Sequence, residues 1–548
     1  MTAQKIYRST YPPAYCPTNL SISQYLTQYN PDAVYKDKII LEDNWTGHAL
    51  TYGGFHNNTA RHAWSLKEKY CLVAGDVVAI SAPNSVAHVE LIHAVLWSGA
   101  TVALINPLST AVDFTHYLRI CRPKVIAIDT DLHQTVVRAL APTALPSRPD
   151  MMFLLGSDPL VPNYPTEFEC ANELPVYDLS MTDNREHTAA ICFSSGTSGK
   201  PKGVELSHYN LIASLAGLRS SDPALYNAHG RCVFFPPLCH IYGFNAVGLM
   251  GIWLGSYNML LKKYSLDELL RLSSACKANT LRIVPSIALA MLKTATLSLH
   301  DLSSIRFILC SGAVLQPEVI QGLQLRFNQA PIFQGYGLTE CNVAILRSHE
   351  SDRVGSVGRL VANVDARVVD DGLNDVAECQ DGELLVRGPT VFRRYLGNPA
   401  ATTETFHGEW MRTGDVLHFD ADGFLYLTDR KKELIKYKGM QVAPSELEGI
   451  LNSHAFVDES AVCATWDDNE GTEIPMAYVT LSKLATKQAK GQDSALDEIM
   501  HFVNGRVSPY KKLRGGIEVL NELPKTASGK ILKRQLPARL AGLRLTKL

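Results

Sequence analysis

The stretch Ser194–Gly203 reads SSGTSGKPKG, and it decides how the rest of the chain is interpreted. The apolar run before it, Thr188 to Phe193, predicts a buried strand, and apolar residues at helical spacing after Ser207 predict a helix. We therefore expect a mobile loop between a strand and a helix. Glycine lets the backbone approach a ligand closely, and the hydroxyl and ammonium groups of this stretch suit a polyphosphate.

Two other interpretations of this stretch were considered. A Walker P-loop needs a glycine five residues after Gly196, and that residue is Pro201. An ordinary surface loop can also be rich in glycine and serine. Lys200 and Lys202 flank the proline and favour an anionic ligand over that alternative.

Length and composition indicate a globular chain of two or more domains. The chain has 548 residues, more than one hydrophobic core usually organises. Lys+Arg 52 against Asp+Glu 54 gives a net charge of −2, which favours neither nucleic acid nor an anionic membrane as a partner. The 12 cysteines include no C-x-x-C pair, so we expect neither a zinc site nor a disulfide framework.

The N-terminal half alternates between expected strands and helices. Asp76–Ser81 and Ala100–Ile105 are expected strands, and Val86–Leu96 is the helix between them. This order predicts a β-α-β unit in a parallel sheet. The most apolar stretch, Phe244–Leu261, is interrupted by polar residues and three glycines, so we expect a buried helix that runs into a strand rather than a membrane span.

Six further motifs follow one another along the chain. They are PPLCHIYGF ending at Phe244, LSSIRFILCSGA ending at Ala313, QGYGLTE ending at Glu340, EWMRTGD ending at Asp415, DRKKELIKYKGMQVAPSELE ending at Glu448 and PKTASGKILKRQL ending at Leu536. QGYGLTE is not a Rossmann fingerprint, because Glu340 stands where the third glycine would be. Together with SSGTSGKPKG, these motifs resemble the signature motifs of the adenylate-forming superfamily, which comprises acyl-CoA synthetases, aryl-CoA ligases and beetle luciferases.

The resemblance runs from about Asp76 to Leu536, and it is closest to the 4-coumarate–CoA ligases. It implies an α/β fold with a large N-terminal adenylation domain of layered sheets and helices, residues 1–431, which holds the ATP and carboxylate sites. A small mobile α+β domain, residues 432–548, would follow a hinge at Lys432. Within it, Ser445-x-x-Glu448 predicts a capping box at the start of a helix.

The implied activity is that of an ATP-dependent carboxylate–CoA ligase that releases AMP and pyrophosphate. An acid would attack the α-phosphorus to give an acyl-AMP, and the thiol of coenzyme A would then attack the acyl carbon. ATP, Mg²⁺ and coenzyme A are the expected cofactors, with a small carboxylic acid as the partner. A luciferase-like oxygenase and a stand-alone enzyme that passes the acyl group to a carrier protein remain alternatives. A sensor without chemistry is disfavoured, because Glu340 and Lys530 are both present.

The same resemblance assigns roles to individual residues. The expected catalytic residues are Lys530, His240, Lys436 and Gln441. The expected ATP or AMP site comprises Ser194, Ser195, Gly196, Thr197, Ser198, Lys202, Ala313, Gln334, Gly335, Tyr336, Thr339, Asp415, Arg430, Lys432, Lys436, Gln441 and Lys530. Glu340 would bind Mg²⁺, which usually takes only one or two carboxylates from a protein beside phosphate oxygens. Coenzyme A would contact Lys263, Lys438 and Gly439.

The acid pocket is expected to have uncharged walls. By the resemblance they are Tyr242, Ala246, Cys310, Ala313, Gly335, Gly337 and Val343, with His240 at the mouth. A charge at the far end of the acid would lack a partner there, so we expect an apolar aryl or medium-chain acid. Cys341-Asn342 differs from the Ala-Gly common in plant coumarate ligases, so coumarate itself is not expected, and Asn342 is a candidate to contact a polar substituent.

The sequence favours a peroxisomal or a cytoplasmic location about equally. Residues 1–20 have no apolar core of a secretory signal. Thr546-Lys547-Leu548 is similar to the S-K-L peroxisomal address, which a peroxisomal import receptor would bind. A cytoplasmic protein with a basic tail is the alternative.

Overall fold

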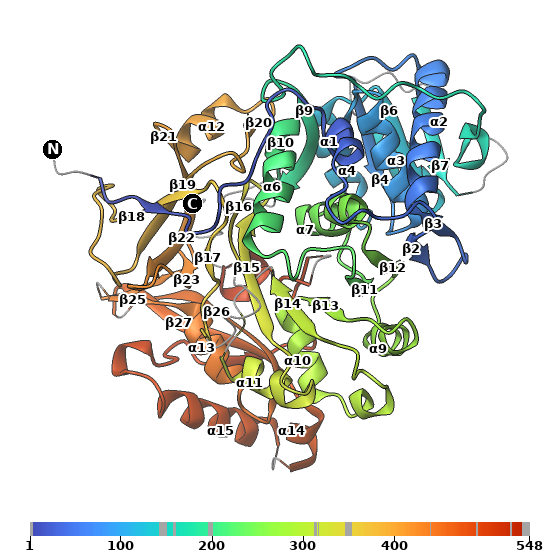
Figure 1. Cartoon of the computed structure of the whole chain (residues 1–548). Coiled ribbons are helices and arrows are strands. Elements are labelled where there is room, and N and C mark those ends of the chain that lie inside the picture. The colour runs from blue at the N-terminus through green and yellow to red at the C-terminus, as the bar shows by residue number, and fades with distance from the viewer. Residues whose placement is uncertain are drawn as a thin grey trace.

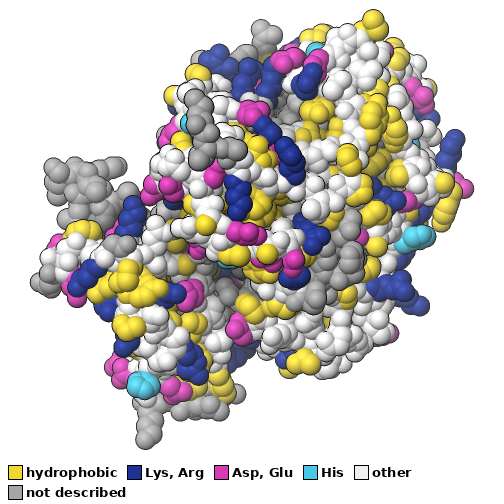
Figure 2. Space-filling view, turned by 60° about the vertical axis from the view of Figure 1, so that its left-hand side comes forward, with side chains coloured by type: hydrophobic (Ala, Val, Ile, Leu, Met, Phe, Trp, Pro, Cys, Tyr) yellow, Lys and Arg dark blue, Asp and Glu magenta, His cyan; other side chains and the backbone are white. Residues whose placement is uncertain are grey.

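The computed structural model describes residues 4–141, 151–156, 161–194, 201–311, 315, 317–345, 353–438, 440–468, 470–488, 491–526 and 529–539. Figure 1 shows a large body of layered sheets and helices, with residues 435–539 forming a smaller body beneath it. On the face seen in Figure 2, basic and acidic side chains are interspersed, as a net charge of −2 leads one to expect. Among the described residues, no helix combines the length and apolar character that crossing a membrane requires.

Eight strands form the largest sheet. In sheet order they are β20 (Arg394–Tyr395), β10 (Lys202–Ser207), β9 (Thr188–Ser194), β5 (Thr101–Leu104), β4 (Val77–Ser81), β6 (Val125–Asp129), β7 (Met152–Leu155) and β8 (Asn163–Tyr164). The strands from β9 to β8 are parallel, whereas β10 and β20 are antiparallel to their neighbours.

Helices cover both faces of this sheet. The helices are α2 (Tyr52–Tyr70), α3 (Val86–Trp97), α4 (Ala111–Cys121), α5 (His133–Leu140) and α6 (His208–Ser221). Val78 and Ile80 pack in one core cluster with residues of α2 and α3, while Ala79 packs in another with residues of α4 and α5. Alternate residues of a strand point to opposite faces, so this division follows from the pleat. The predicted β-α-β unit is confirmed, since β4, α3 and β5 follow in order and the two strands are parallel.

Two smaller sheets with parallel strands continue the large body. One contains β11 (Arg231–Phe234), β12 (Tyr257–Leu260), β2 (Ile39–Asp43) and β3 (Ala49–Thr51), and the other contains β13 (Thr280–Ile283), β14 (Phe307–Ser311), β15 (Ile332–Leu338), β16 (Cys341–Ile345) and β17 (Arg359–Leu360). The helices around them are α1 (Ile22–Gln28), α7 (Ile241–Gly243), the π-helix η4 (Phe244–Gly251), α8 (Ile252–Leu254), α9 (Leu266–Ala275), α10 (Pro285–Lys293) and α11 (Pro317–Arg326). The run from 244 to 261 is buried helix followed by strand, as predicted.

An antiparallel sheet completes the large body. It contains β1 (Tyr7–Arg8), β18 (Asp365–Val369), β19 (Gly382–Arg387), β22 (Trp410–Phe419), β21 (Phe406–His407) and β23 (Leu425–Arg430), and α12 (Pro399–Thr405) lies between β20 and β21 in the sequence. The smaller body contains β24 (Ile435–Tyr437), β25 (Met440–Val442), α13 (Pro444–Asn452), β26 (Val457–Asp467), β27 (Thr472–Leu481), α14 (Lys483–Gln488), α15 (Gln492–Asn504) and β28 (Ile517–Val519). It has its own core, in which residues such as Leu447, Val479 and Ile499 pack together.

The prediction that the glycine- and serine-rich stretch joins a strand directly to a helix is wrong. Strand β10 begins at Lys202 and pairs antiparallel with β9, so the stretch joins two neighbouring strands. The predicted helix is α6, and it begins only after β10, with Ser207 as its N-cap. A strand, not the N-terminus of a helix, therefore follows the stretch in the sequence.

The predicted capping box at Ser445 is also wrong. Proline is favoured in the first turn of a helix, and here Pro444 begins α13, so Ala443 is the N-cap. The hydroxyl of Ser445 instead donates to the carbonyl of Thr428 at 2.8 Å. Glu448 accepts a hydrogen bond from the Val462 amide at 2.7 Å, and Lys533 Nζ lies 2.9 Å from its Oε1.

Candidate active site

A buried carboxylate lies where two sheets of the large body meet. Asp415 on β22 and Arg430 on β23 face each other in the antiparallel register, and Arg430 Nε lies 3.3 Å from Asp415 Oδ1. Tyr336 on β15, from a different sheet, donates its hydroxyl to Asp415 Oδ2 at 2.7 Å. Asp415 is only 3% exposed, and burial raises its pKa although Arg430 and Tyr336 both oppose the rise. The three residues thus form a fixed polar cluster with a carboxylate at its centre.

A second carboxylate, Glu340, follows β15, the strand that carries Tyr336. Glu340 lies in the turn between β15 and β16, is 8% exposed, and accepts a hydrogen bond from the Tyr395 hydroxyl at 2.8 Å. Lys202 Nζ lies 4.5 Å from the centroid of the Tyr395 ring. Strand β20 therefore brings together one predicted phosphate-binding lysine and the predicted metal ligand. Tyr395 lies in none of the sequence motifs, so no sequence pattern predicted its role.

The motif residue Gln334 has a mainly structural setting. Its Oε1 accepts from the Leu315 amide at 2.8 Å, and its Nε2 donates to the Ser356 carbonyl at 3.3 Å. Both ends of the side chain therefore hold backbone. This arrangement fixes the segment after β14 against β15.

Some predicted residues cannot be placed. Ser195, Gly196, Thr197, Ser198, Ala313, Gly439 and the tripeptide 546–548 lie outside the described residues, and only the backbone of Val343 is described. Ser194 lies at the end of β9, and its buried hydroxyl finds no hydrogen-bond partner in the described part of the chain.

Lys530 brings the smaller body to this cluster. Its pKa is lowered to about 8 by burial and by the Arg430 cation, while the carboxylates of Glu433 and Asp415 oppose the fall. The residue is exposed to solvent, yet charged groups of both bodies, such as Asp415 and Lys533, lie within electrostatic range of it. Its loop also touches the large body, since a Cβ on Gly529 would lie 3.2 Å from the hydroxyl of Ser286 in α10.

His240 lies within electrostatic range of Lys530. His240 keeps exposed surface, yet the surrounding protein atoms desolvate the ring and lower its pKa to about 4; the Lys530 cation contributes, so the imidazole is neutral at pH 7. His240 is the N-cap of α7, and its Nδ1 accepts a hydrogen bond from the Tyr242 amide at 3.2 Å. This fixes the tautomer, because an accepting Nδ1 leaves the proton on Nε2.

The remaining predicted catalytic residues lie on a hairpin of the smaller body. Lys436 and Gln441 pair across β24 and β25, and both side chains are exposed. Lys438 Nζ lies 3.4 Å from Glu470 of the same body. Lys432 and Lys263 are also exposed. The structure thus brings Lys530, not the hairpin, to Asp415.

The residues predicted to form the acid pocket come from α7, η4 and the sheet of β14, β15 and β16. Tyr242 of α7 and Ala246 of η4 pack in one core cluster, and Cys310 is fully buried on β14. A Cβ on Gly335 would meet its nearest atom at 3.9 Å, whereas one on Gly337 would lie 2.9 Å from the carbonyl oxygen of Cys341. A Cβ at Gly335 would therefore fit in ordinary van der Waals contact, while Gly337 is required by the close approach of two strands.

Asn342 is already held by protein. Its amide donates to the hydroxyl of Ser214, which also accepts from Asn245 at 2.9 Å. This network joins β16 to α6 and η4.

Sequence comparison assigns the chain to a family. The family described as AMP-binding enzyme matches residues 30–396, and the AMP-binding enzyme C-terminal domain matches residues 446–530. The chain belongs to this family of adenylate-forming enzymes. 4-Coumarate–CoA ligase-like 9 of Arabidopsis thaliana is 35% identical over 509 residues, which cover 90% of this chain and 86% of that protein. 4-Coumarate–CoA ligase 1 of the same plant is 31% identical over 553 residues, covering 98% and 95%.

Two further similarities bear on location and fold. The Peroxisomal OPC-8:0-CoA ligase 1 of Arabidopsis thaliana is 32% identical over 533 residues, which cover 95% of this chain and 93% of that protein. The crystal structure of the anthranilate CoA ligase AuaEII in complex with anthranoyl-AMP superposes with a TM-score of 0.84 at 24% identity, covering 96% of this chain and 99% of that one. The predicted α/β fold with a large N-terminal and a small C-terminal domain is confirmed. The chain is an adenylate-forming CoA ligase, of a family whose substrates include ATP and coenzyme A.

Proposed function

We propose that the enzyme joins an aryl or medium-chain carboxylic acid to coenzyme A through an acyl-AMP, in two half-reactions at one site. The observation that carries the proposal is the position of Lys530. This lysine comes from the small domain, yet it lies within electrostatic range of Asp415, Arg430 and His240 of the large one. The names of the relatives favour this activity over a luciferase-like oxygenase or an enzyme that loads a carrier protein.

In the first half-reaction the acid attacks the α-phosphorus of ATP, and pyrophosphate leaves. Asp415 would accept hydrogen bonds from the ribose hydroxyls, with Arg430 and Tyr336 holding the carboxylate in place. Lys202 and the 194–198 segment would hold the β- and γ-phosphates, and Thr339 the α-phosphate. Lys530 would stabilise the negative charge that develops between the acid and the phosphate, as preorganised cations do.

Magnesium fits a site at Glu340. The described residues contain no group of three or more histidine, cysteine, aspartate or glutamate side chains that could enclose a metal ion. Mg²⁺ commonly needs only one protein carboxylate, because substrate phosphates and water complete its shell. Glu340 would be that ligand, and the Tyr395 hydroxyl on its Oε1 would orient it. The ion would neutralise phosphate charge.

In the second half-reaction the thiol of coenzyme A attacks the acyl carbon. We propose that the small domain rotates about Lys432, withdraws Lys530, and presents the hairpin with Lys436 and Gln441. Lys438 and Gly439 would then line the path of the thiol arm, and Lys263 would meet the phosphates of the coenzyme. His240, which is neutral and carries its proton on Nε2, would lie at the mouth of the acid pocket.

A pyrophosphate-release assay with a panel of acids tests the proposal. With acid and ATP alone, we expect one equivalent of pyrophosphate per enzyme and then a stop. Coenzyme A should restore turnover and yield the thioester. Light emission without coenzyme A, or transfer only to an added carrier protein, would favour the alternatives.

The cellular location is proposed on weaker support. One relative is named peroxisomal, which is compatible with a peroxisomal enzyme that an import receptor delivers. A fluorescent fusion at the N-terminus distinguishes peroxisomes from cytoplasm. Diffuse fluorescence would exclude the peroxisome.

A further inference from the structure

Asn84 is a buried residue that joins two sheets of the large body, and no role was predicted for it from the sequence. It follows β4 of the eight-stranded sheet, immediately before Ser85, the N-cap of α3, and it is 5% exposed. Its Nδ2 donates to the carbonyls of Phe235 at 3.2 Å and Pro236 at 3.0 Å, and its Oδ1 accepts from the Leu238 amide at 2.9 Å. One side chain thus fixes a loop that lies far away in the sequence.

The loop needs this side chain because two of its residues lack an N–H group. It joins β11 to α7, and neither Pro236 nor Pro237 can donate a hydrogen bond. Buried backbone carbonyls nevertheless need donors, and an unsatisfied one costs free energy. The side chain of Asn84 supplies a donor group for two carbonyls and an acceptor for the first amide after the prolines, as a neighbouring strand would do.

The loop in turn sets the position of His240. The His240 amide donates to the Pro237 carbonyl at 3.0 Å, which closes a turn directly after the residues that Asn84 holds. No Cβ would fit at Gly243 of α7, because it would overlap the Pro237 carbonyl oxygen, so the start of this helix packs directly on the loop. The imidazole of His240 is fixed to the same helix start through the amide of Tyr242. A displacement of the loop would therefore displace the ring of His240.

We infer that Asn84 is a positioning residue of the ligase reaction, which acts through the loop 235–238 to hold His240 at the mouth of the acid pocket. This inference rests on the proposed function, which gives His240 that place. The side chain of Asn84 is occupied by the loop, so its effect on the acid is indirect. The cluster of Asp415 and Tyr336 has its own hydrogen bond, so the loss of Asn84 should impair use of the acid rather than of ATP.

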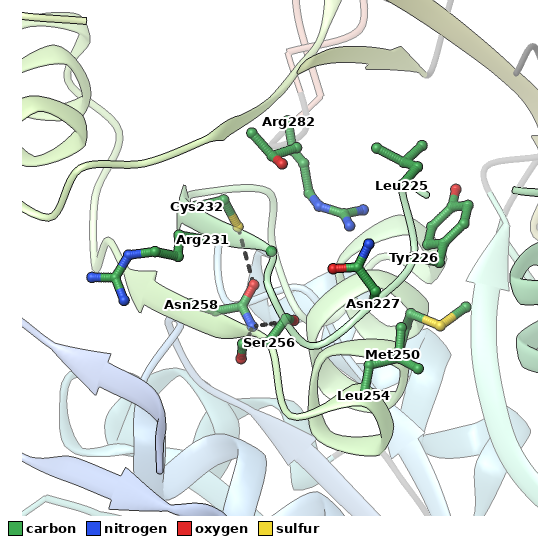
Figure 3. A pocket seen from close by; sticks show the side chains of 12 residues that line it. Leu225, Tyr226, Asn227, Arg231, Cys232, Met250, Leu254, Ser256, Asn258 and Arg282 are labelled. Carbon is green, nitrogen blue, oxygen red and sulfur yellow. Dashed lines mark hydrogen bonds between the residues drawn. The ribbon is translucent and has the colours of Figure 1, made fainter. Parts of the chain in front are cut away.

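A second buried asparagine provides a matched control, beside the start of the same strand β11. Asn258 of β12 is 2% exposed, its Oδ1 accepts from the Cys232 thiol at 3.0 Å, and its Nδ2 donates to the carbonyl of Ser256 at 2.9 Å. Figure 3 shows these residues around a small pocket with room for about one water molecule. The hydrogen bonds of Asn258 hold β11, β12 and the turn before β12, so Asn258→Ala should destabilise the protein without moving His240.

The test compares the two asparagines in pyrophosphate release, with cinnamate and octanoate as one acid of each proposed class and coenzyme A present to sustain turnover. We expect Asn84→Ala to lower kcat/KM for the acid on the order of 10- to 100-fold and to leave KM for ATP unchanged, because small misplacements of an active-site group have effects of this size. Asn258→Ala also leaves buried groups unsatisfied, so it should lower Tm comparably, but kcat/KM for the acid should stay at the wild-type value. Asn84→Asp keeps the shape and the acceptor but loses the donor group, so it should show the same selective loss if the alanine variant does not fold.

A double-mutant cycle with His240→Ala shows whether Asn84 acts through His240. If it does, Asn84→Ala should cost little further in the His240→Ala enzyme, so the two effects should not add. Full additivity, or an equal loss of kcat/KM in Asn84→Ala and Asn258→Ala, would overturn the inference and leave the ligase function standing. Failure of both acids to release pyrophosphate with the wild-type enzyme would instead contradict the proposed function.

Discussion

Replacing Lys530 by alanine should abolish acid activation but spare the second half-reaction. Lys530 is a cation of the small domain that lies within electrostatic range of both Asp415 and Arg430. Removing one preorganised group of this kind costs on the order of 10²- to 10³-fold in rate, or about 3 to 4 kcal/mol of transition-state stabilisation. Thioester formation from a supplied acyl-AMP needs no such charge at the α-phosphate, so its rate should stay near that of the wild type.

The same lysine predicts a pH dependence with a definite sign. A group with a pKa of about 8 is about 90% protonated at pH 7 and about 10% at pH 9. If the ammonium form is required, kcat/KM for pyrophosphate release falls about tenfold over that interval, since this constant reports the free enzyme. Stability changes in the opposite direction. The pKa of Lys530 in the folded protein lies below the usual value of 10.5. Between pH 8 and 10.5 the unfolded chain therefore binds more protons than the folded one, and the free energy of unfolding rises as the pH rises.

The assay measures the two half-reactions separately. The first is followed as pyrophosphate release from acid and ATP, and the second as thioester formed from synthetic acyl-AMP and coenzyme A. Lys525→Ala is the matched control, because Lys525 belongs to the same motif but pairs with Glu459 at 2.6 Å within the small domain. An equal loss of both half-reactions in Lys530→Ala would refute the exchange of catalytic groups. A tenfold fall between pH 7 and 9 in its residual activity would assign the pKa to another group.

Four other substitutions follow from single contacts. Tyr395→Phe removes the hydroxyl that donates to Glu340 while keeping the ring, so the Mg²⁺ concentration for half-maximal activity should rise on the order of tenfold; an unchanged Mg²⁺ titration would contradict this role. Gly335→Ala adds a Cβ that the fold accommodates, 3.9 Å from its nearest neighbours, and should shift preference towards shorter acids in a graded series, whereas Gly337→Ala forces a Cβ to 2.9 Å from a carbonyl oxygen and should lower activity with every acid. The same ranking of acids in Gly335→Ala and in the wild type would remove this residue from the pocket. Lys533→Met should destabilise the small domain by about 1 to 3 kcal/mol in thermal unfolding, because it removes the cation shared by two half-buried carboxylates, Glu433 and Glu448; an unchanged Tm would show that their other partners suffice.

Local sequence patterns predicted the elements whose neighbours are close in the chain. The strands and the helix of the β-α-β unit were correct because apolar periodicity records burial directly. Strand β10 was missed for a physical reason. Its centre, Val204-Glu205-Leu206, is buried at all three positions, and Glu205 is paired with Arg394 of β20. An alternating pattern cannot appear where both faces are covered, and the partner of the charge lies far away in the sequence.

The same limit applies to the site. Motif resemblance located Tyr336, Asp415 and Arg430, and the structure brings them into contact. Tyr395 could not be found in this way, because it lies in no motif. Its importance depends on what the fold places beside it, which is the carboxylate of Glu340.

The contacts between the two domains also differ in kind from those inside the small one. Lys533 is largely buried and lies 2.9 Å from Glu448, so this pair would move as a unit with the small domain. Lys293 of α10 lies 3.4 Å from Asp458 of β26, with both side chains substantially exposed. Exposed ion pairs of this sort contribute about 0 to 1 kcal/mol. Lys293 also donates to the carbonyl of Val457 at 2.9 Å. A rotation about Lys432 would break these contacts of Lys293 and keep the Lys533–Glu448 pair inside the small domain.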